Sequence, residues 1–285
     1  MDLYSITVYR NLEELRKIQD EREVNPFIFG NTKDNIDYCP EICIDISALI
    51  HLLLINKSNI ESAYMNLANM TEDTLIAEYT INYKKTHSQT LLPMIDEICR
   101  MTENNAADCD IIAVSNGPGS FTGLRIGAAT GKGLALALDK PMVAVPTLEA
   151  MAYNFYGDDR IICPVMDARR AHLYSGLYRF ENGKLITVHE QCLISYGELA
   201  GILNEVKEKV VFVGDGIAAA KDYFKDNLTC NYTFSPAGLR TQRASSVALA
   251  AIDMANEGKT IGSDMLKPDY LRPSQAEREH SGKRA

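Results

Sequence analysis

An α/β fold with mixed β-sheets flanked by helices is the class that the sequence predicts. From about residue 74 onward, short runs of β-branched and apolar residues alternate with stretches whose apolar residues recur at helical spacing. Hydrophobic residues make up 46% of the chain and charged residues 24%, a composition that excludes a largely disordered protein. The length of 285 residues corresponds to about two domains, each large enough to bury a core.

The N-terminal part of the chain carries few regular patterns. A helix is predicted over 11–21 and a short strand over 42–46. A second helix is predicted over 58–70, because Ser58 and Glu61 have the spacing of a capping box at its start. The polar residues between the first helix and the strand show no period, so they predict loop.

The strands expected in the rest of the chain are runs of β-branched, aromatic and other apolar residues. Asn182-Gly183 lies between two such runs and predicts the tight turn of a hairpin. Strands are therefore expected over 74–83, 110–115, 142–145, 161–166 and 210–213, with a hairpin formed by 171–180 and 184–189.

Helices are expected where apolar residues recur every three or four positions. Pro93 should lie in the first turns of its helix, where a missing N–H costs little, and Thr147 should cap another helix. The polar tail from Lys259 predicts no regular element. The expected helices are 87–101, 122–138, 147–156, 196–207, 217–224 and 244–256.

The net charge of the chain limits the classes of partner that it can bind. Lys and Arg total 29 against 38 Asp and Glu, which gives a net charge of −9. A broad nucleic-acid-binding surface needs clustered Lys and Arg, so this balance excludes one but leaves room for a local basic patch.

Cysteine usage and the apolar runs predict a cytoplasmic protein that does not associate with membranes. The seven cysteines are scattered, without a C-x-x-C pair, which is typical of reduced thiols. The first residues lack the apolar core of a signal peptide. The longest apolar run, 48–55, is far shorter than the ~20 residues of a membrane-spanning helix.

The most informative segment is the glycine-rich loop SNGPGSFTGLRIG, residues 115–127. It follows a predicted strand and opens a predicted helix, a placement that exposes backbone N–H groups to an anion. Its glycines do not have the spacing of a dinucleotide-binding loop. Gly127 to Gly133 also departs from the P-loop, because the spacing is short and no Ser or Thr follows Lys132. Neither nucleotide motif is therefore present.

The helix after this loop carries small residues on one face. Gly123, Gly127, Gly131 and Ala135 recur every four residues. Each glycine inside a helix costs about 1 kcal/mol relative to alanine, so a close approach by another element is expected along this stripe. Two alternatives remain open, namely tight packing within the chain and contact with a partner subunit.

No catalytic or metal-binding motif is recognisable in the sequence, since catalytic sets such as Ser/His/Asp are spatial and cannot be identified from spacing. The five histidines include no pair three or four residues apart, so no helix offers two imidazoles to one metal. Asp167, Arg169 and Arg170 follow the strand 161–166 and form either a structural ion pair or a contact for an anion. Nothing in these patterns, taken alone, demands catalysis or a metal held by this chain.

Several segments together resemble one protein family. The segment 117–127 is the most specific, and the order and spacing of the others support it. The segments are 74–80, 86–93, 117–127, 132–135, 146–150, 166–170 with Tyr174, and 270–273 with Ala276 and Glu277. They resemble the bacterial TsaB family, also called YeaZ, from about residue 70 to residue 277.

This resemblance implies an actin-like ATPase (ASKHA) fold of two lobes. It assigns 42–150 to the N-terminal lobe and 151–285 to the C-terminal lobe, with 1–41 as an extension. The implied role is the formation of threonylcarbamoyladenosine on tRNA, at the adenosine beside the anticodon. A related TsaD subunit is the transferase there, and TsaB-like proteins are its non-catalytic dimerisation partner.

The same resemblance implies where the cofactors and the other partners belong. ATP and a divalent metal are expected in partner subunits, and a TsaE-like ATPase joins the assembly. The tRNA is expected to bind the assembly without contacting this chain directly. The segment that carries H-x-x-x-H in a TsaD-like protein aligns with 147–151. Thr147 and Met151 occupy the two ligand positions, and neither suits a divalent ion as imidazole does.

The resemblance also assigns site residues. The family docks its partner through helices of the N-terminal lobe, which favours a subunit interface with a TsaD-like chain or in a homodimer. The expected interface residues are His87, Leu91, Leu92, Gly123, Ile126, Gly127, Thr130, Gly131 and Leu134. The family motif loop comprises Gly117, Pro118, Gly119, Ser120, Phe121, Thr122 and Arg125.

The N-terminus departs from the family pattern. Residues 44–47 are an imperfect echo of its first strand, 48–69 lack the second strand, and 1–41 have no counterpart. One hypothesis is a frame or start-site difference, so that 1–69 is not the ordinary family sequence.

Two other functions compete with the partner role. A kinase or ATPase of the actin-like superfamily needs a metal-binding carboxylate, for which Asp45 and Asp215 are candidates, and phosphate loops in both lobes. A glycoprotease-like metalloprotease needs the missing histidine pair.

Overall fold

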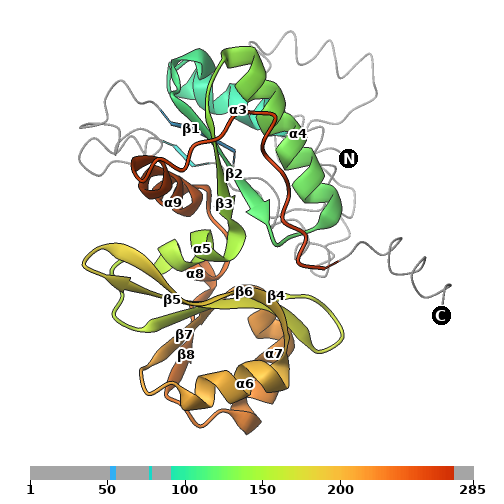
Figure 1. Ribbon diagram of the computed structural model, residues 1–285, viewed down its shortest axis with the longest axis vertical. Helices are drawn as coiled ribbons and strands as arrows, with labels where there is room; N and C mark the ends of the chain where they lie inside the picture. Colours follow the sequence, from blue (N-terminus) through green and yellow to red (C-terminus); the bar gives the residue numbers. More distant parts are fainter. Residues whose placement is uncertain (1–51, 56–76, 79–90, 273–285) are drawn as a thin grey trace, which may run out of the picture.

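Two β-sheets, each flanked by helices, make up the computed structural model (Figure 1). It describes residues 52–55, 77–78 and 91–272. The first sheet has the strand order β1-β2-β3. Strand β2 pairs antiparallel with β1 and parallel with β3. The strands are β1 (Leu52–Ile55), β2 (Ile111–Gly117) and β3 (Met142–Pro146).

Apolar side chains cover both faces of the first sheet, because alternate residues of a strand point to opposite sides. Ile111 and Val143 pack on helix α9 (Ala244–Asn256). Ile112 and Met142 pack on the opposite side, against helix α4 (Phe121–Leu138). Helix α3 (Leu91–Met101) lies near α4, and a short 3-10 helix, Ala106–Asp108, leads into β2.

The second sheet has the order β6-β5-β4-β7-β8. Strand β4 pairs antiparallel with β5 and parallel with β7, while β5 and β6 form a long hairpin. The strands are β4 (Ile161–Asp167), β5 (His172–Glu181), β6 (Lys184–Ser195), β7 (Val210–Val213) and β8 (Tyr232–Phe234).

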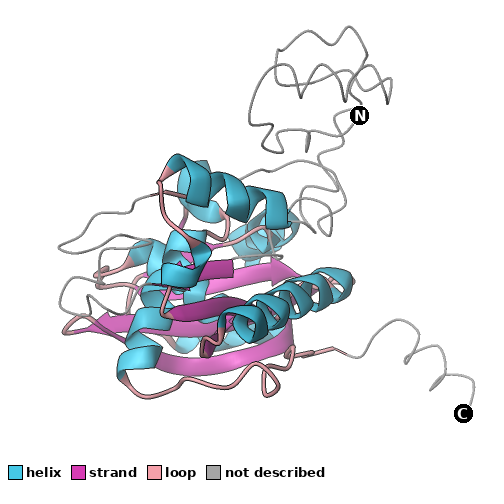
Figure 2. Ribbon diagram, turned by 90° about the horizontal axis from the view of Figure 1, so that it is seen from above, coloured by secondary structure: helices cyan, strands magenta, loops and turns pink. Residues whose placement is uncertain are grey.

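Helices cover both sides of the second sheet as well (Figures 1 and 2). Its outer face packs on α6 (Tyr196–Glu205) and α7 (Gly216–Asn227). Its inner face packs on α5 (Thr147–Ala152), which continues as the 3-10 helix Tyr153–Phe155. Helix α5 therefore lies between the two sheets.

The chain returns to the first sheet after β8. A short helix, α8 (Ala237–Arg240), leads into α9, and residues 259–272 then run as an irregular segment, here called the strap, past α4 (Figure 1). Ile261 of the strap exchanges two backbone hydrogen bonds of 2.8 Å with Met142. Leu266 is buried among residues of α4 and β3. Segments from both sides of residue 150 thus build the core around the first sheet.

The predicted class is confirmed, and most predicted elements lie within a few residues of the observed ones. The helix over 244–256 and the strand over 210–213 have the expected bounds. The segment 48–69, in which the second strand of the family was not expected, contains the strand Leu52–Ile55, which pairs antiparallel with β2. Its apolar run shows no alternation that would have marked it as a strand. Strand β8 and helix α8 were missed, since both are very short.

Two further details differ from the predictions. Pro146, not Thr147, is the N-cap residue of α5. Strand β6 extends to Ser195, six residues beyond the predicted end of the hairpin. The elements predicted over 11–21, 42–46 and 58–70 lie outside the described residues, as does 74–83 except for Ala77 and Glu78.

Candidate functional site

The glycine-rich loop is covered by the strap. The backbone N–H of Asp269 donates a 2.7 Å hydrogen bond to the carbonyl oxygen of Asn116. Gly117 has a φ of +130°, and a Cβ atom there would collide with the Asp269 carbonyl. Glycine is required at this position by both the backbone conformation and the close approach of the strap. The loop therefore receives another segment of the same chain.

Aromatic stacking continues this contact into helix α4. The rings of Phe121 and Tyr270 are 4.8 Å apart between centroids. The guanidinium carbon of Arg125 lies 4.1 Å from the centroid of the Phe121 ring, a cation–π geometry. Phe121 and Arg125 of α4 and Tyr270 of the strap thus form one stack.

The strap also reaches the second sheet. The side-chain amide of Gln191 donates a 2.8 Å hydrogen bond to the carboxylate of Asp269. The guanidinium of Arg272 donates to the carbonyl oxygen of Ala168. The strap thus contacts both the glycine loop, through Asp269, and the 166–170 segment, through Arg272.

The turn after β4 has an unusual backbone. Arg169, Arg170 and Ala171 are consecutive non-glycine residues in the left-handed region, with φ values of +63°, +56° and +55°. Such a conformation costs about 1–3 kcal/mol per residue, so the surroundings must hold it. Asp167 helps to hold this backbone, because its carboxylate accepts a 2.8 Å hydrogen bond from the Arg169 N–H and pairs with the Arg169 guanidinium at 3.2 Å.

Further hydrogen bonds tie this turn to its neighbours. The Ala168 N–H donates to the carbonyl of His172 at 3.1 Å. The N–H of Tyr196, at the start of α6, donates to the Ala171 carbonyl at 3.1 Å. Of the three residues predicted to form an ion pair or an anion contact, Asp167 and Arg169 form the pair. The side chain of Arg170 is exposed.

A second carboxylate lies at the neighbouring strand end. Burial raises the pKa of Asp215 to about 6, and the charge of nearby Asp167 acts in the same direction. Gly214 and Gly216 flank Asp215, and a Cβ atom at Gly214 would collide with the Val165 carbonyl. The two glycines let β7 and α7 approach β4 closely, which brings the two carboxylates near each other.

Thr147 and Met151, the two residues predicted to align with the histidine pair, both form contacts within the chain. The Thr147 and Ser115 hydroxyl groups share a buried hydrogen bond of 2.7 Å. Met151 is buried, and the side-chain amide of Gln242 lies 3.8 Å from its sulfur and 3.4 Å from that of Met166. In the part of the chain that the structure describes, no three His, Cys, Asp or Glu side chains are grouped so as to hold a metal ion.

The residues of the predicted partner interface differ in how far they are exposed. The glycine stripe of α4, Gly123, Gly127 and Gly131, is buried within the chain. Their burial in the single chain favours packing within the chain as the reason for the stripe, and an interface role for these glycines stays a prediction. Leu91 is buried and Leu92 is 51% exposed. An interface role stays a prediction for Leu92 and for the half-buried Ile126, Thr130 and Leu134, while His87 lies outside the described residues.

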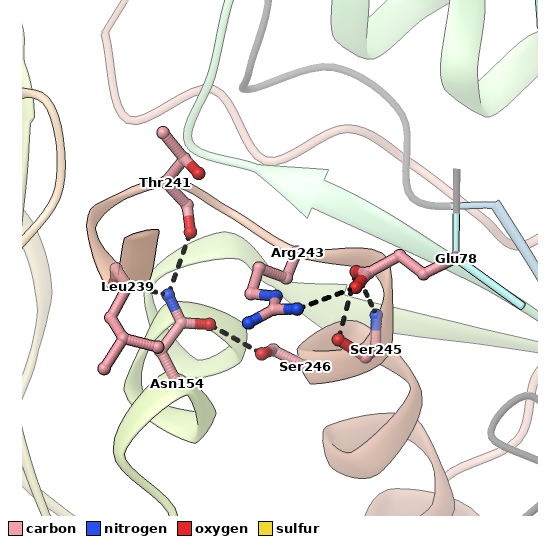
Figure 3. A network of polar contacts seen from close by, with 7 residues as sticks. All are labelled: Glu78, Asn154, Leu239, Thr241, Arg243, Ser245 and Ser246. Carbon is pink, nitrogen blue, oxygen red and sulfur yellow. Dashed lines mark hydrogen bonds and ion pairs between the residues drawn. The ribbon is translucent and has the colours of Figure 1, made fainter. Parts of the chain in front are cut away.

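A polar network at the start of α9 was missed at the sequence level (Figure 3). Glu78 accepts hydrogen bonds of 3.0 Å from the N–H and the hydroxyl of Ser245, and pairs with Arg243 at 3.0 Å. Asn154 donates to the Leu239 and Thr241 carbonyls at 2.9 Å and accepts from Ser246 at 2.6 Å. The only sequence signal was that Glu78 belongs to the motif 74–80.

Two of the general expectations can be compared with the structure. The cysteines within the described residues, Cys99, Cys109, Cys163, Cys192 and Cys230, are free thiols. Within the same residues, no helix combines the length and the apolar character needed to cross a bilayer.

Comparison with known proteins gives consistent matches. The family model described as "TsaD: tRNA N6-adenosine threonylcarbamoyltransferase" matches residues 74–280. The tRNA threonylcarbamoyladenosine biosynthesis protein TsaB of Bacillus subtilis is 34% identical over 226 residues, which are 79% of this chain and 96% of that protein. The Escherichia coli protein of the same name is 30% identical over 201 residues, 69% of this chain and 85% of that protein.

The solved structures agree with the sequence relatives. YeaZ from Pseudomonas aeruginosa superimposes with a TM-score of 0.55 and 23% identity, over 65% of this chain and 84% of that one. This likeness supports the predicted actin-like fold. Because the sequence match extends over almost the whole length of the Bacillus subtilis protein, the predicted resemblance is confirmed. The chain belongs to the TsaB (YeaZ) family.

Proposed function

We propose that this chain is a non-catalytic subunit of a tRNA N6-threonylcarbamoyladenosine transferase complex. It stabilises a TsaD-like subunit, which carries out the transfer to the adenosine beside the anticodon. The observation that carries the proposal is the state of Thr147 and Met151. Both are buried and engaged with Ser115 and Gln242, where a metal-binding relative would present two imidazoles.

The covered glycine loop supports the same function. The strap occupies the space in front of Gly117, so this loop is filled by the chain itself. We accordingly place ATP and the divalent metal in the partner subunits, the TsaD-like transferase and a TsaE-like ATPase. Free thiols fit work in the cytoplasm, where thiols are kept reduced.

Reconstitution of the modification tests this function. The purified chain, a TsaD-like protein and a TsaE-like ATPase are combined with tRNA, ATP, Mg²⁺ and a threonylcarbamoyl donor, and the modified nucleoside is quantified by mass spectrometry. We expect product from the complete mixture and almost none when this chain is left out. Product from this chain alone would overturn the non-catalytic role.

Nucleotide calorimetry separates this proposal from the kinase alternative. We expect the isolated chain to show no tight binding of ATP with Mg²⁺. The carboxylates of Asp167 and Asp215, at adjacent strand ends, are the groups that a kinase would use for the metal, so a variant with both changed to Asn is the matched comparison. Tight binding that this variant loses would favour the kinase.

A further inference from the structure

We propose that the surface around the end of the strap contacts the RNA substrate directly, through phosphate groups and unstacked bases. This inference rests on the proposed function and deepens it, because it gives the non-catalytic subunit a surface for tRNA. The strap-end surface is defined by Phe121, Arg125, Arg169, Arg170, Tyr270 and Arg272.

These residues are joined by a chain of short contacts. Arg125 lies over the Phe121 ring, and this ring packs against Tyr270. Two residues further on, Arg272 binds the carbonyl oxygen of Ala168, the residue just before Arg169. These contacts connect Arg125 of α4, Arg272 of the strap and Arg169 of the turn after β4 in one series of neighbouring residues.

The turn fixes two of these arginines. Its three left-handed residues are held by hydrogen bonds from both sides, so the backbone presents Arg169 and Arg170 outward. The Arg169 side chain is 62% exposed even though it pairs with Asp167. Arg170 is also exposed, and among the described residues its guanidinium forms no ion pair. Strained backbone of this kind is concentrated at functional sites.

The local charge is opposite to that of the whole molecule. Four arginines lie near three carboxylates, Asp167, Asp215 and Asp269, a difference of 4 − 3 = +1 in a chain of net charge −9. Asp215 is largely buried, while Asp167 pairs with Arg169 and Asp269 binds Gln191. The exposed guanidinium group of Arg170 beside them is suited to a phosphate, which it can bind through two hydrogen bonds.

The aromatic rings favour RNA over an acidic protein surface. Tyr270 is 38% exposed, next to the Arg125–Phe121 stack. Proteins that bind single-stranded nucleic acid combine arginines along the backbone with rings on which bases stack. An acidic protein surface would need the arginines alone. Because the chain is acidic as a whole, this contact adds to the main RNA site of the partner rather than replacing it.

Charge reversal at Arg170 tests the inference. The full-length chain is assembled with its TsaD-like partner, and binding of a labelled tRNA transcript is followed by fluorescence anisotropy over a range of salt concentrations. Arg170→Glu should weaken binding about fivefold, the effect of one exposed charge contact. It should also lower the slope of log Kd against log salt by about 0.7 to 0.9. Arg125→Glu should act in the same direction.

Lys209→Glu is the matched control. Lys209 is exposed and precedes β7 at its amino end, where its carbonyl binds the Ile161 N–H. Since β4 and β7 are parallel, this end lies opposite the turn after β4. The charge change is the same, and we expect no effect. If Arg170→Glu does not fold, Arg170→Gln removes the charge alone and should weaken binding by a smaller factor.

Three results would overturn the inference. The first is that Arg170→Glu leaves tRNA binding unchanged. The second is that Arg170→Glu and Lys209→Glu weaken binding by the same factor. The third is that Arg170→Glu disrupts assembly with a partner protein while the assembled complex binds tRNA normally. The last result would assign the surface to an acidic protein. The proposed function is judged separately by reconstitution without this chain, so it can stand when the RNA contact fails.

Discussion

Glu78 caps helix α9 from 167 residues away, accepting a 3.0 Å hydrogen bond from the backbone N–H of Ser245. Ser245 is the second residue of α9, and such N–H groups have no partner inside the helix. A carboxylate also interacts favourably with the positive end of the helix dipole. This contact ties the segment before α3 to the helix that covers the first sheet.

Removing this cap should destabilise the fold. Burial tends to raise the pKa of Glu78, but the hydrogen bonds of Ser245 and the charge of Arg243 outweigh it, so the pKa lies below the usual 4.5. A lowered pKa in the folded state means that the stabilisation is complete above pH 4.5 and is lost as the pH falls through the folded pKa. Glu78→Ala should therefore cost about 1–2 kcal/mol at pH 7.

Urea unfolding at pH 7 and at low pH checks this prediction. The difference between wild type and Glu78→Ala should shrink at low pH. Exposed Glu103→Ala is the control for loss of a carboxylate and should show almost no change. An equal loss for the two variants would contradict the capping role.

The contacts of Glu78 illustrate what the sequence could and could not predict. Helices such as 244–256 follow from the spacing of apolar residues, which is a local property. The pairs Glu78–Ser245 and Asn116–Asp269 join segments more than 100 residues apart, and no period connects them. The motifs that carry the family resemblance named these segments, but only the structure shows that they meet.

The candidate site shows the same limit. The glycine stripe of α4 predicted a close approach, and spacing alone left packing and a partner as alternatives. Burial of Gly123 and Gly127 in the single chain favours packing. Thr147 was expected to cap a helix because of its residue type, whereas its hydroxyl binds Ser115 on the adjacent strand. A residue's preference for a position does not reveal which buried partner competes for it.

Gly117 should tolerate no side chain. Gly117→Ala would place a Cβ atom against the Asp269 carbonyl and force a residue with a side chain to adopt a φ of +130°. We expect a loss of about 3 kcal/mol or more, seen as a large fall in Tm. Gly133→Ala is the matched control, because nothing lies within 4 Å of its Cβ position in α4, so it should stabilise by up to about 1 kcal/mol. Equal Tm values for the two variants would mean that the strap does not lie on the loop.

Leu266 should anchor the strap. Its side chain is 1% exposed among residues of α4 and β3, so Leu266→Ala should cost about 2–5 kcal/mol. The neighbouring Met265 is 60% exposed, and Met265→Ala should change stability by less than about 0.5 kcal/mol. Chemical denaturation of the two variants measures this difference. Similar small effects would show that the strap is not part of the core.

Asp215 should make stability depend on pH in the opposite sense to Glu78. Its pKa is raised from 3.8 to about 6, so the folded state favours the protonated form. The stabilisation of the folded state by this protonated carboxyl group is complete below about pH 4 and is lost as the pH rises through 6. Asp215→Asn cannot ionise and should be more stable than wild type at pH 8, by about 1–3 kcal/mol, with a much smaller difference at pH 4. The difference in Tm between wild type and Asp215→Asn, measured from pH 4 to pH 8, checks this prediction. Asp222→Asn, at an exposed position of the same helix, is the control for replacing a carboxylate by an amide.

Leu92 offers the clearest test of the predicted partner interface. Its side chain is 51% exposed on α3, so a charge at this position should leave the fold intact, with a change in stability below about 0.5 kcal/mol. If α3 docks a TsaD-like subunit or a second copy of the chain, Leu92→Glu buries an unpaired charge in that contact. We expect co-purification with the partner to be lost and any homodimer to dissociate in light scattering. Leu136→Glu, on the 76% exposed position of α4, is the matched control outside the predicted set. Retention of the complex by Leu92→Glu, or its loss with Leu136→Glu instead, would move the interface away from the predicted face.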